Sequence, residues 1–227
     1  MPPAAQVKNI FTRIAPRYDL MNRLMTGGQD VVWRRMVIVQ ARLADGDRLL
    51  DLGAGTGDLT REALRQQPGC RATAADFTLA MMRMGQRRPG PRLAWSAADA
   101  LRLPFPANSL DALVSGFLLR NVADLDGALR EQLRVLKPGG RWVALDTTRP
   151  RPSLFSPFIH FHMHTLIPLL GTLITGQRDA YTYLPETSEA FLRAEELAAH
   201  LAAAGFCKVA FRRLNFGTVA IHWGEKA

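Results

Sequence analysis

The stretch Leu49-Leu50-Asp51-Leu52-Gly53-Ala54-Gly55-Thr56-Gly57-Asp58 predicts the fold of this chain. Apolar residues lead into an acid, and glycines then alternate with small residues. This order is typical of a strand that ends in a glycine-rich turn and opens a helix. There the backbone can approach a ligand closely, because no Cβ stands in the way. An ordinary tight turn between a strand and a helix has the same pattern, so the ligand must be argued from other residues.

The spacing of the glycines narrows the choice of ligand. A dinucleotide fingerprint, Gly-x-Gly-x-x-Gly, needs a glycine where this chain has Asp58. An acid at the start of a helix also repels a pyrophosphate. A glycine turn flanked by acids suits a ligand that carries an ammonium group, ribose hydroxyls and a cationic sulfonium. S-adenosylmethionine has all three. We therefore expect Asp51, Gly53 and Gly55 to contribute to a site for S-adenosylmethionine.

Composition limits the class of protein. The chain has 227 residues, of which 48% are hydrophobic, and this fits a single domain with one large core. Its 29 Lys and Arg outnumber 20 Asp and Glu, which gives a formal charge of +9. Such a surplus favours a solvated basic surface or contact with an anionic membrane. No long basic run and no patch of basic and aromatic residues occurs, so we expect no nucleic-acid partner.

Two cysteines, Cys70 and Cys207, are too few and too far apart for a disulfide framework or a zinc site. They predict packed thiols in a reducing cytoplasm. The first residues show no apolar run of the kind that opens a secretory signal. We expect a cytoplasmic protein with a transient contact at the inner face of the membrane.

The segment 154–176 is apolar enough to suggest a membrane span. Prolines and three alternating histidines argue against a span: Pro157, His160, His162, His164 and Pro168. An apolar cover over a pocket, or a surface that touches lipid, explains the segment better. The apolar setting argues against a metal site, and use of one histidine as a general base is the alternative.

Strands alternate with helices through the middle of the chain. Strands are predicted at 48–52, 71–77, 92–97, 109–117 and 141–146, and helices at 58–67, 78–87 and 126–136. This alternation predicts an α/β, Rossmann-like fold with a mostly parallel sheet and helices on both faces. After a helix at 194–204, strand-like runs at 208–216 and 218–223 meet around Gly217 and predict an antiparallel hairpin.

A helical leader precedes this core. Val7, Ile10, Phe11 and Ile14 fall on one helical face, and apolar residues continue beyond Pro16. The leader either packs simply or lies across the pocket as a lid. We divide the chain, as a single domain, into a lid (1–45), a cofactor-binding core (46–150), an apolar substrate-covering segment (151–190) and a C-terminal helix with a hairpin (191–227).

Two further acids follow predicted strands. Asp76 lies 25 residues after Asp51, at the end of the second strand, where a carboxylate can accept hydrogen bonds from both hydroxyls of a ribose. Capping of the next helix is the alternative, although Thr78 is also available as a cap. Asp99 follows the third strand and either binds the exocyclic amine of adenine or is a solvated charge.

Arg120 and Asn121 follow the fourth strand, at the edge where such sheets hold substrates. An arginine in an apolar stretch needs a partner. We expect it to bind a phenolate oxygen or to position a water. An internal salt bridge to Asp124 or Asp126 is the alternative.

Several motifs together resemble the menaquinone and ubiquinone biosynthesis C-methyltransferases, within the class I S-adenosylmethionine-dependent enzymes. The motifs are Tyr18-Asp19-Leu20-Met21-Asn22, Trp33-Arg34-Arg35, Gly55-Thr56-Gly57-Asp58-Leu59-Thr60, Leu103-Pro104-Phe105-Pro106, Leu119-Arg120-Asn121-Val122, Arg134-Val135-Leu136-Lys137-Pro138-Gly139-Gly140 and Tyr181-x-Tyr183-Leu184. The leader motif and the Arg-Asn-Val element are specific to this family. The glycine loop and the Lys-Pro-Gly-Gly turn occur throughout class I.

The resemblance implies a seven-stranded sheet with a reversed last strand, and methyl transfer to a ring carbon of a prenylated quinol such as demethylmenaquinol. It implies cofactor contacts from a set at the sheet edge: Thr56, Asp76, Asp99, Ala100, Ser115 and Gly116. It places Arg120 and Asn121, as catalytic residues, toward the ring, with Tyr18, Asn22 and Tyr181 as further substrate contacts.

The chain departs from the family pattern at three places. Gly116 stands where the family usually has serine, Gly28-Gln29 replaces a glycine-histidine pair, and 146–150 replaces Glu-Phe-Ser-Lys-Pro. Another small aromatic or sterol-like acceptor therefore stays open as a substrate. A nucleic-acid-binding module that kept the pocket without turnover is the alternative from another class of protein.

Overall fold

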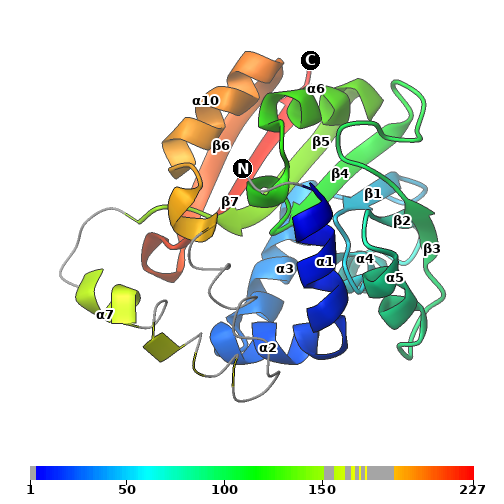
Figure 1. Ribbon diagram of the computed structural model, residues 1–227. Coiled ribbons are helices and arrows are strands. Elements are labelled where there is room, and N and C mark those ends of the chain that lie inside the picture. The colour runs from blue at the N-terminus through cyan, green and yellow to red at the C-terminus, as the bar shows by residue number, and fades with distance from the viewer. Residues whose placement is uncertain (1–3, 151–155, 162–164, 167–168, 170–171, 173–186) are drawn as a thin grey trace.

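A mixed sheet forms the centre of the computed structural model (Figure 1), which describes residues 4–150, 156–161, 165–166, 169, 172 and 187–227. Its strands run in the order β3-β2-β1-β4-β5-β7-β6. They are β1 (Arg48–Leu52), β2 (Arg71–Asp76), β3 (Ala94–Ala97), β4 (Leu110–Gly116), β5 (Leu136–Thr147), β6 (Phe206–Leu214) and β7 (Val219–Lys226). The described helices are α1 (Ala4–Ile14), α2 (Tyr18–Met25), α3 (Gln29–Ala41), α4 (Asp58–Gln66), α5 (Leu79–Gln86), α6 (Leu125–Val135), α7 (Ser156–Phe161) and α10 (Ala194–Ala204).

Parallel pairing brings the carboxyl ends of the central strands to one edge. Leu52 pairs with Ala75 of β2 and with Ser115 of β4, and Gly116 pairs with Leu145 of β5. The residues that directly follow β1, β2 and β4 therefore lie close together. These are the positions at which the sequence predicts binding residues.

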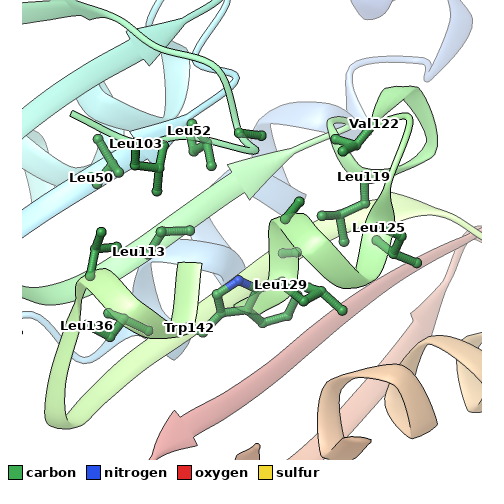
Figure 2. Close-up of a cluster of buried hydrophobic side chains, with 14 of the residues drawn as sticks. Leu50, Leu52, Leu103, Leu113, Leu119, Val122, Leu125, Leu129, Leu136 and Trp142 are labelled. Carbon is green, nitrogen blue, oxygen red and sulfur yellow. The ribbon is translucent and has the colours of Figure 1, made fainter. Parts of the chain in front are cut away.

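Alternate residues of each strand face opposite sides of the sheet. On β1, Leu50 and Leu52 face the core beneath α6 and α10, whereas Leu49 faces the core beneath α3 and α4. Figure 2 shows the first of these cores, with Leu129 of α6 above Trp142 of β5. Trp142 Nε1 donates a hydrogen bond of 2.7 Å to Gln132 Oε1, which satisfies the buried indole. Both faces of the sheet are thus covered, as predicted.

The last strand is inserted into the sheet. β7 lies between β5 and β6 and pairs antiparallel with both. This confirms the predicted reversal and the pairing of the last two runs. The short 3-10 helix η4 (Asn215–Gly217) joins them.

Two predicted details differ. β5 begins at Leu136, because Lys137 to Gly140, read as a turn, continue directly into the strand. β5 has extra residues at this point, since Leu110 of β4 pairs with Leu136 and Ala112 pairs with Arg141. The register between the two strands therefore shifts. Thr78 precedes α5, yet its side chain makes no capping hydrogen bond.

The leader, defined here as residues 4–25, contains α1, the 3-10 helix η1 (Ala15–Arg17) and α2. Pro16 stands in η1, where the helical path changes. Ile10, Ile14 and Met21 are buried, which confirms an apolar face toward the protein. Figure 1 shows α1 in front of the sheet with α2 below it.

Among the described residues, no helix combines the length and the apolar character that crossing a bilayer requires. Cys70 and Cys207 are both free thiols, and Cys70 is buried.

Candidate cofactor and acceptor site

Two adjoining pockets lie at the carboxyl edge of the sheet. The first, called here the apolar pocket, includes Val7 and Phe11 of the leader, Phe77, Asp99 and Val122 in its wall. The second, called here the acidic pocket, has a wall that includes Asp19, Arg34, Asp51, Thr56 and Asp58. Both pockets share part of their lining: Tyr18, Gly53, Gly55, Gly116 and Phe117. One elongated ligand can therefore pass the glycine loop and reach both.

The glycine loop is closely packed against neighbouring side chains. Gly53 and Gly57 have φ values of +69° and +86°, which favour glycine. A Cβ on Gly53 would lie 2.9 Å from Leu118 Cδ1, and one on Gly57 would lie 2.8 Å from Leu93 Cδ1. The loop therefore presents bare backbone to the pockets, as the sequence predicts.

Asp51 carries an unsatisfied oxygen beside the acidic pocket. Its Oδ2 accepts hydrogen bonds from Thr60 N at 2.9 Å and Thr60 Oγ1 at 2.7 Å. Its Oδ1 is buried and has no hydrogen-bond partner within the part of the chain that the structure describes. Burial raises the pKa of Asp51 to about 7, although the Thr60 hydrogen bonds oppose the shift. A ligand with an ammonium group would satisfy this oxygen and stabilise the carboxylate.

Asp76, at the end of β2, accepts a hydrogen bond from the glycine loop. Its Oδ2 accepts a hydrogen bond of 2.7 Å from Gly55 N, and its Oδ1 accepts one of 2.6 Å from Thr78 N. Burial raises the pKa of Asp76, and these backbone donors oppose the shift. Asp76 also lines the apolar pocket, so the carboxylate can support the start of α5 and still face a ligand.

The remaining predicted cofactor residues line at least one of the pockets, with the exception of Ser115. Asp99 and Ala100 line the apolar pocket, and Asp99 Oδ1 accepts a hydrogen bond of 2.9 Å from Leu101 N. Gly116 lines both pockets and Thr56 lines the acidic one. Ser115, in contrast, is buried behind the surface, and the lining of neither pocket includes it.

Tyr18 stands where the two pockets meet. Burial raises the pKa of its hydroxyl, opposed by a hydrogen bond with the Asn22 side chain and by the positive charges of Arg120 and Arg34. Asn22 is buried and lines neither pocket. Its position supports Tyr18 rather than a ligand.

Of the two predicted catalytic residues, Asn121 lines the apolar pocket and Arg120 does not. Asn121 Nδ2 donates a hydrogen bond of 3.1 Å to the carbonyl of Phe117. Arg120 is buried and its Nη1 donates a hydrogen bond of 2.7 Å to Asp146 Oδ1. Its guanidinium also lies 5.2 Å from the centre of the Phe117 ring, which lines both pockets.

The alternative role of Arg120, an internal salt bridge, exists with a partner other than Asp124 or Asp126. Asp124 caps α6 by accepting a hydrogen bond of 2.9 Å from Gly127 N, and Asp126 Oδ1 lies 2.6 Å from His200 Nδ1. The register of β5 against β4 instead places Asp146 beside Arg120.

Comparison with known proteins identifies the family of the chain. The model of the ubiE/COQ5 methyltransferase family matches residues 3–226. This protein belongs to that family. It is 43% identical to the ubiquinone/menaquinone biosynthesis C-methyltransferase UbiE of Desulfotalea psychrophila, over 97% of this chain and 90% of the relative. It is also 43% identical to the demethylmenaquinone methyltransferase of Thermus thermophilus, over 96% of this chain and 100% of the relative.

Solved structures confirm the fold of the methyltransferase. The [4+2]-cyclase SpnF superposes with a TM-score of 0.72 at 20% identity and covers 99% of this chain and 97% of its own. An S-adenosylmethionine-dependent methyltransferase of Thermotoga maritima, described as a possible histamine N-methyltransferase, gives a TM-score of 0.69 at 17% identity, over 96% of this chain and 99% of its own. The predicted α/β class and family are therefore both confirmed.

Some predicted residues fall outside the described part of the methyltransferase. Tyr181, His162 and His164 are among them, together with most of the apolar segment. His160 is described and its side chain is exposed. Among described residues, no group of three or more His, Cys, Asp or Glu side chains is arranged to hold a metal ion.

Sequence reasoning missed the basic residues behind the glycine loop of the methyltransferase. Arg61 Nη1 donates a hydrogen bond of 2.6 Å to the carbonyl of Thr56, and its Nη2 donates one of 2.7 Å to the carbonyl of Gly85. Arg88 Nη1 donates a hydrogen bond of 3.0 Å to Thr56 Oγ1. Neither arginine belongs to a motif that indicates contact with the loop.

Proposed function

We propose that this protein transfers a methyl group from S-adenosylmethionine to a ring carbon of a prenylated quinol, with demethylmenaquinol as the acceptor. The observation that carries the proposal is the pair of pockets joined across the glycine loop. The acidic pocket has a buried, unsatisfied carboxylate suited to an ammonium group. The apolar pocket has carboxylates suited to a nucleoside beside apolar walls suited to an acceptor ring. A relative named demethylmenaquinone methyltransferase, 43% identical along almost the whole chain, supports the same acceptor.

The cofactor fits the polar atoms at the sheet edge. Asp51 Oδ1 would accept a hydrogen bond from its ammonium group, and Asp76 would hold the ribose hydroxyls. Asp99, beside Ala100, would accept from the exocyclic amine of adenine. Three carboxylates also favour a cationic ligand over a neutral one.

When bound, S-adenosylmethionine supplies a methyl group on a cationic sulfur, so the protein has mainly to align a nucleophile with it. Tyr18 of the leader and Asn121 of η2 (Leu119–Asn121) are polar side chains in the wall of the apolar pocket. The raised pKa of Tyr18 keeps its hydroxyl protonated at neutral pH. It can therefore donate a hydrogen bond to an ionised ring oxygen, which makes the neighbouring ring carbon nucleophilic.

Arg120 does not line the apolar pocket, and it influences the acceptor ring through Tyr18 and Phe117. Its positive charge opposes the effect of burial on Tyr18 and lies against the ring of Phe117. We assign it to the stabilisation of negative charge in the pocket without direct contact to the acceptor. Water, or a histidine of the apolar segment, would take the proton from the ring carbon.

The isoprenoid tail of the acceptor needs an apolar path. Val7 and Phe11 of α1, with Leu118 and Val122, form one wall of the apolar pocket. The leader would then act as the lid, and the segment 151–190 would cover the tail. Phe158 and Phe161 of α7, in that segment, are 64% and 57% exposed.

A surface with a formal charge of +9 and exposed aromatic side chains suits a peripheral contact with an anionic membrane, where a prenylated quinol dissolves. We propose such a contact at the cytoplasmic face. It would let the tail pass from the bilayer to the pocket without crossing water.

The test is methyl transfer by the purified protein from labelled S-adenosylmethionine to three acceptors. These are demethylmenaquinol, the corresponding demethylated benzoquinol, and a naphthoquinol without a tail. We expect transfer to demethylmenaquinol, with the benzoquinol slower and the tail-less ring slowest. Binding of the cofactor without transfer to any quinol would overturn the proposed acceptor.

A further inference from the structure

We propose that Arg88 is a positioning residue that fastens the leader over the acidic pocket, and that release of this contact controls exchange of the cofactor. The inference rests on the proposed function, since it assumes that the ammonium end of S-adenosylmethionine occupies the acidic pocket beside Asp51. It concerns a residue outside the predicted site, in the connection that follows α5.

Arg88 joins three separate parts of the site through one nitrogen. Its Nη1 lies 3.0 Å from Asp19 Oδ2 of α2, 3.0 Å from Thr56 Oγ1 of the glycine loop and 2.6 Å from Asp58 Oδ1 in the first turn of α4. Asp19 and Asp58 are both acids, so the guanidinium also screens their mutual repulsion. Without it, the leader would present a carboxylate to another carboxylate.

Thr56 completes the connection between the leader and the loop. Its hydroxyl donates a hydrogen bond of 2.8 Å to Asp19 Oδ1, so its oxygen is left to accept from Arg88. Thr56 is buried and lines the acidic pocket. The contact is therefore part of the pocket wall and not a distant surface pair.

Asp19 is adjacent to Tyr18, the leader residue that lines both pockets. The contacts that hold Asp19 consequently fix the place of Tyr18 above the glycine loop. At the other end of the leader, Lys8 Nζ lies 5.4 Å from the centre of the Phe77 ring, beside the apolar pocket. The leader is thus attached near each of the two pockets.

The Arg88 contact is suited to opening. The side chains of Arg88 and Asp19 are each 33% exposed, so water and salt can compete for the ion pair. Asp58 would still have a cationic partner without Arg88, because Arg34 Nη1 lies 3.6 Å from its Oδ2. Loss of Arg88 would therefore leave no deeply buried acid without a partner, and the fold should survive its replacement.

The experiment measures the dissociation rate of labelled S-adenosylhomocysteine from the full chain by rapid exchange with unlabelled ligand. Arg88→Met removes the charge and keeps the length of the side chain, and Asp19→Asn removes the charge of its partner. Arg65→Met is the matched control, since Arg65 pairs with Glu62 on α4 and is 60% exposed. Arg88→Lys tests whether charge alone restores the contact.

We expect both Arg88→Met and Asp19→Asn to raise the dissociation rate about fivefold, which corresponds to loss of one partly exposed ion pair. The KM for S-adenosylmethionine should rise more than kcat falls. The double variant should dissociate at the rate of either single variant, because both remove the same contact. Added NaCl should accelerate release from the wild type and from Arg65→Met, and should change release from the other variants little.

Dissociation from Arg88→Met and Asp19→Asn at the rate of the wild type would overturn the role of Arg88. If Arg88→Met does not fold, Asp19→Asn alone decides, since its side chain has the same size as the original. Failure of the wild type to bind S-adenosylhomocysteine would instead overturn the proposed function, and the two failures are therefore distinguishable.

Discussion

Asp146 holds Arg120 at both its side chain and its backbone. Asp146 Oδ1 accepts a hydrogen bond of 2.7 Å from Arg120 Nη1. Asp146 Oδ2 accepts one of 3.4 Å from the backbone N–H of Arg120 and one of 2.8 Å from that of Leu119. The two side chains are 5% and 2% exposed. The pair therefore fixes η2, the turn that carries Asn121 into the apolar pocket.

Replacement of Arg120 by Met should therefore lower the free energy of unfolding by about 3 kcal/mol, because it leaves the buried Asp146 without its partner. Asp146→Leu on its own should cost a similar amount. The double variant Arg120→Met/Asp146→Leu should lose less than the sum of the two. Urea denaturation measures all three. A loss below about 1 kcal/mol for Arg120→Met would show that the pair contributes little to stability.

Asp51 should make cofactor affinity depend on pH. Its pKa of about 7 means that acid neutralises the carboxylate that an ammonium group needs. Affinity for S-adenosylmethionine should therefore rise as pH increases from 6 to 8, by up to about tenfold for each pH unit below the pKa. Calorimetric titrations at several pH values measure this dependence.

The Asp51→Asn variant should lose most of that pH dependence and bind the cofactor more weakly. Without ligand at pH 8 it should be more stable than the wild type, since the raised pKa means that the buried charge destabilises the fold above neutral pH. Its amide oxygen can still accept from Thr60. An unchanged pH dependence of binding in Asp51→Asn would place the titrating group elsewhere.

His222 should reduce stability in mild acid. Its Nε2 lies 2.9 Å from the carbonyl of Ala194 and must carry a hydrogen, whereas its buried Nδ1 has no partner among the described residues. Burial lowers the pKa of His222, and the hydrogen bond to Ala194 opposes the shift. As pH falls, His222 is protonated in the unfolded chain before it is protonated in the folded chain. The free energy of unfolding therefore decreases as pH drops below about 6.5.

Urea denaturation at pH 7.5 and 5.5 measures this effect. The wild type should lose about 1 kcal/mol more than His222→Gln, whose amide can still donate to Ala194. Equal losses in the two proteins would assign the acid sensitivity to other groups.

Exposed aromatic residues of α7 should contribute to membrane contact. The protein should bind vesicles that contain phosphatidylglycerol at low salt, and binding should weaken as NaCl screens the charges. Phe158→Ser/Phe161→Ser should bind less than the wild type. Phe216→Ser is the matched control, since Phe216 is 65% exposed and lies in η4. Absence of vesicle binding by the wild type at low salt would refute the membrane contact.

Elements bounded by strong turn residues could be predicted from the sequence almost residue by residue. α10 spans the predicted 194–204, because Gly205, with a φ of +105°, ends it in a conformation that favours glycine. β1 also has its predicted limits. β5 was predicted too short, since the start of the strand depends on pairing with β4 and not on local residue types.

The site was predictable where it follows from strand ends. Asp76, Asp99 and Gly116 line the pockets because parallel strands bring their carboxyl ends together. Contacts between distant residues were not predictable. Arg120 meets Asp146 across 26 positions and Arg88 meets Asp19 across 69, and only the three-dimensional register decides such partners.

The insertion of β7 between β5 and β6 has a consequence for biosynthesis. While the ribosome is still adding residues 219–226, the edge of β5 has no neighbour and β6 has no place in the sheet. An unpaired edge of this kind attracts other chains. The nascent polypeptide therefore depends on β7 to protect the edge of β5 from aggregation, and chaperones that shield open strand edges would act before β7 is in place.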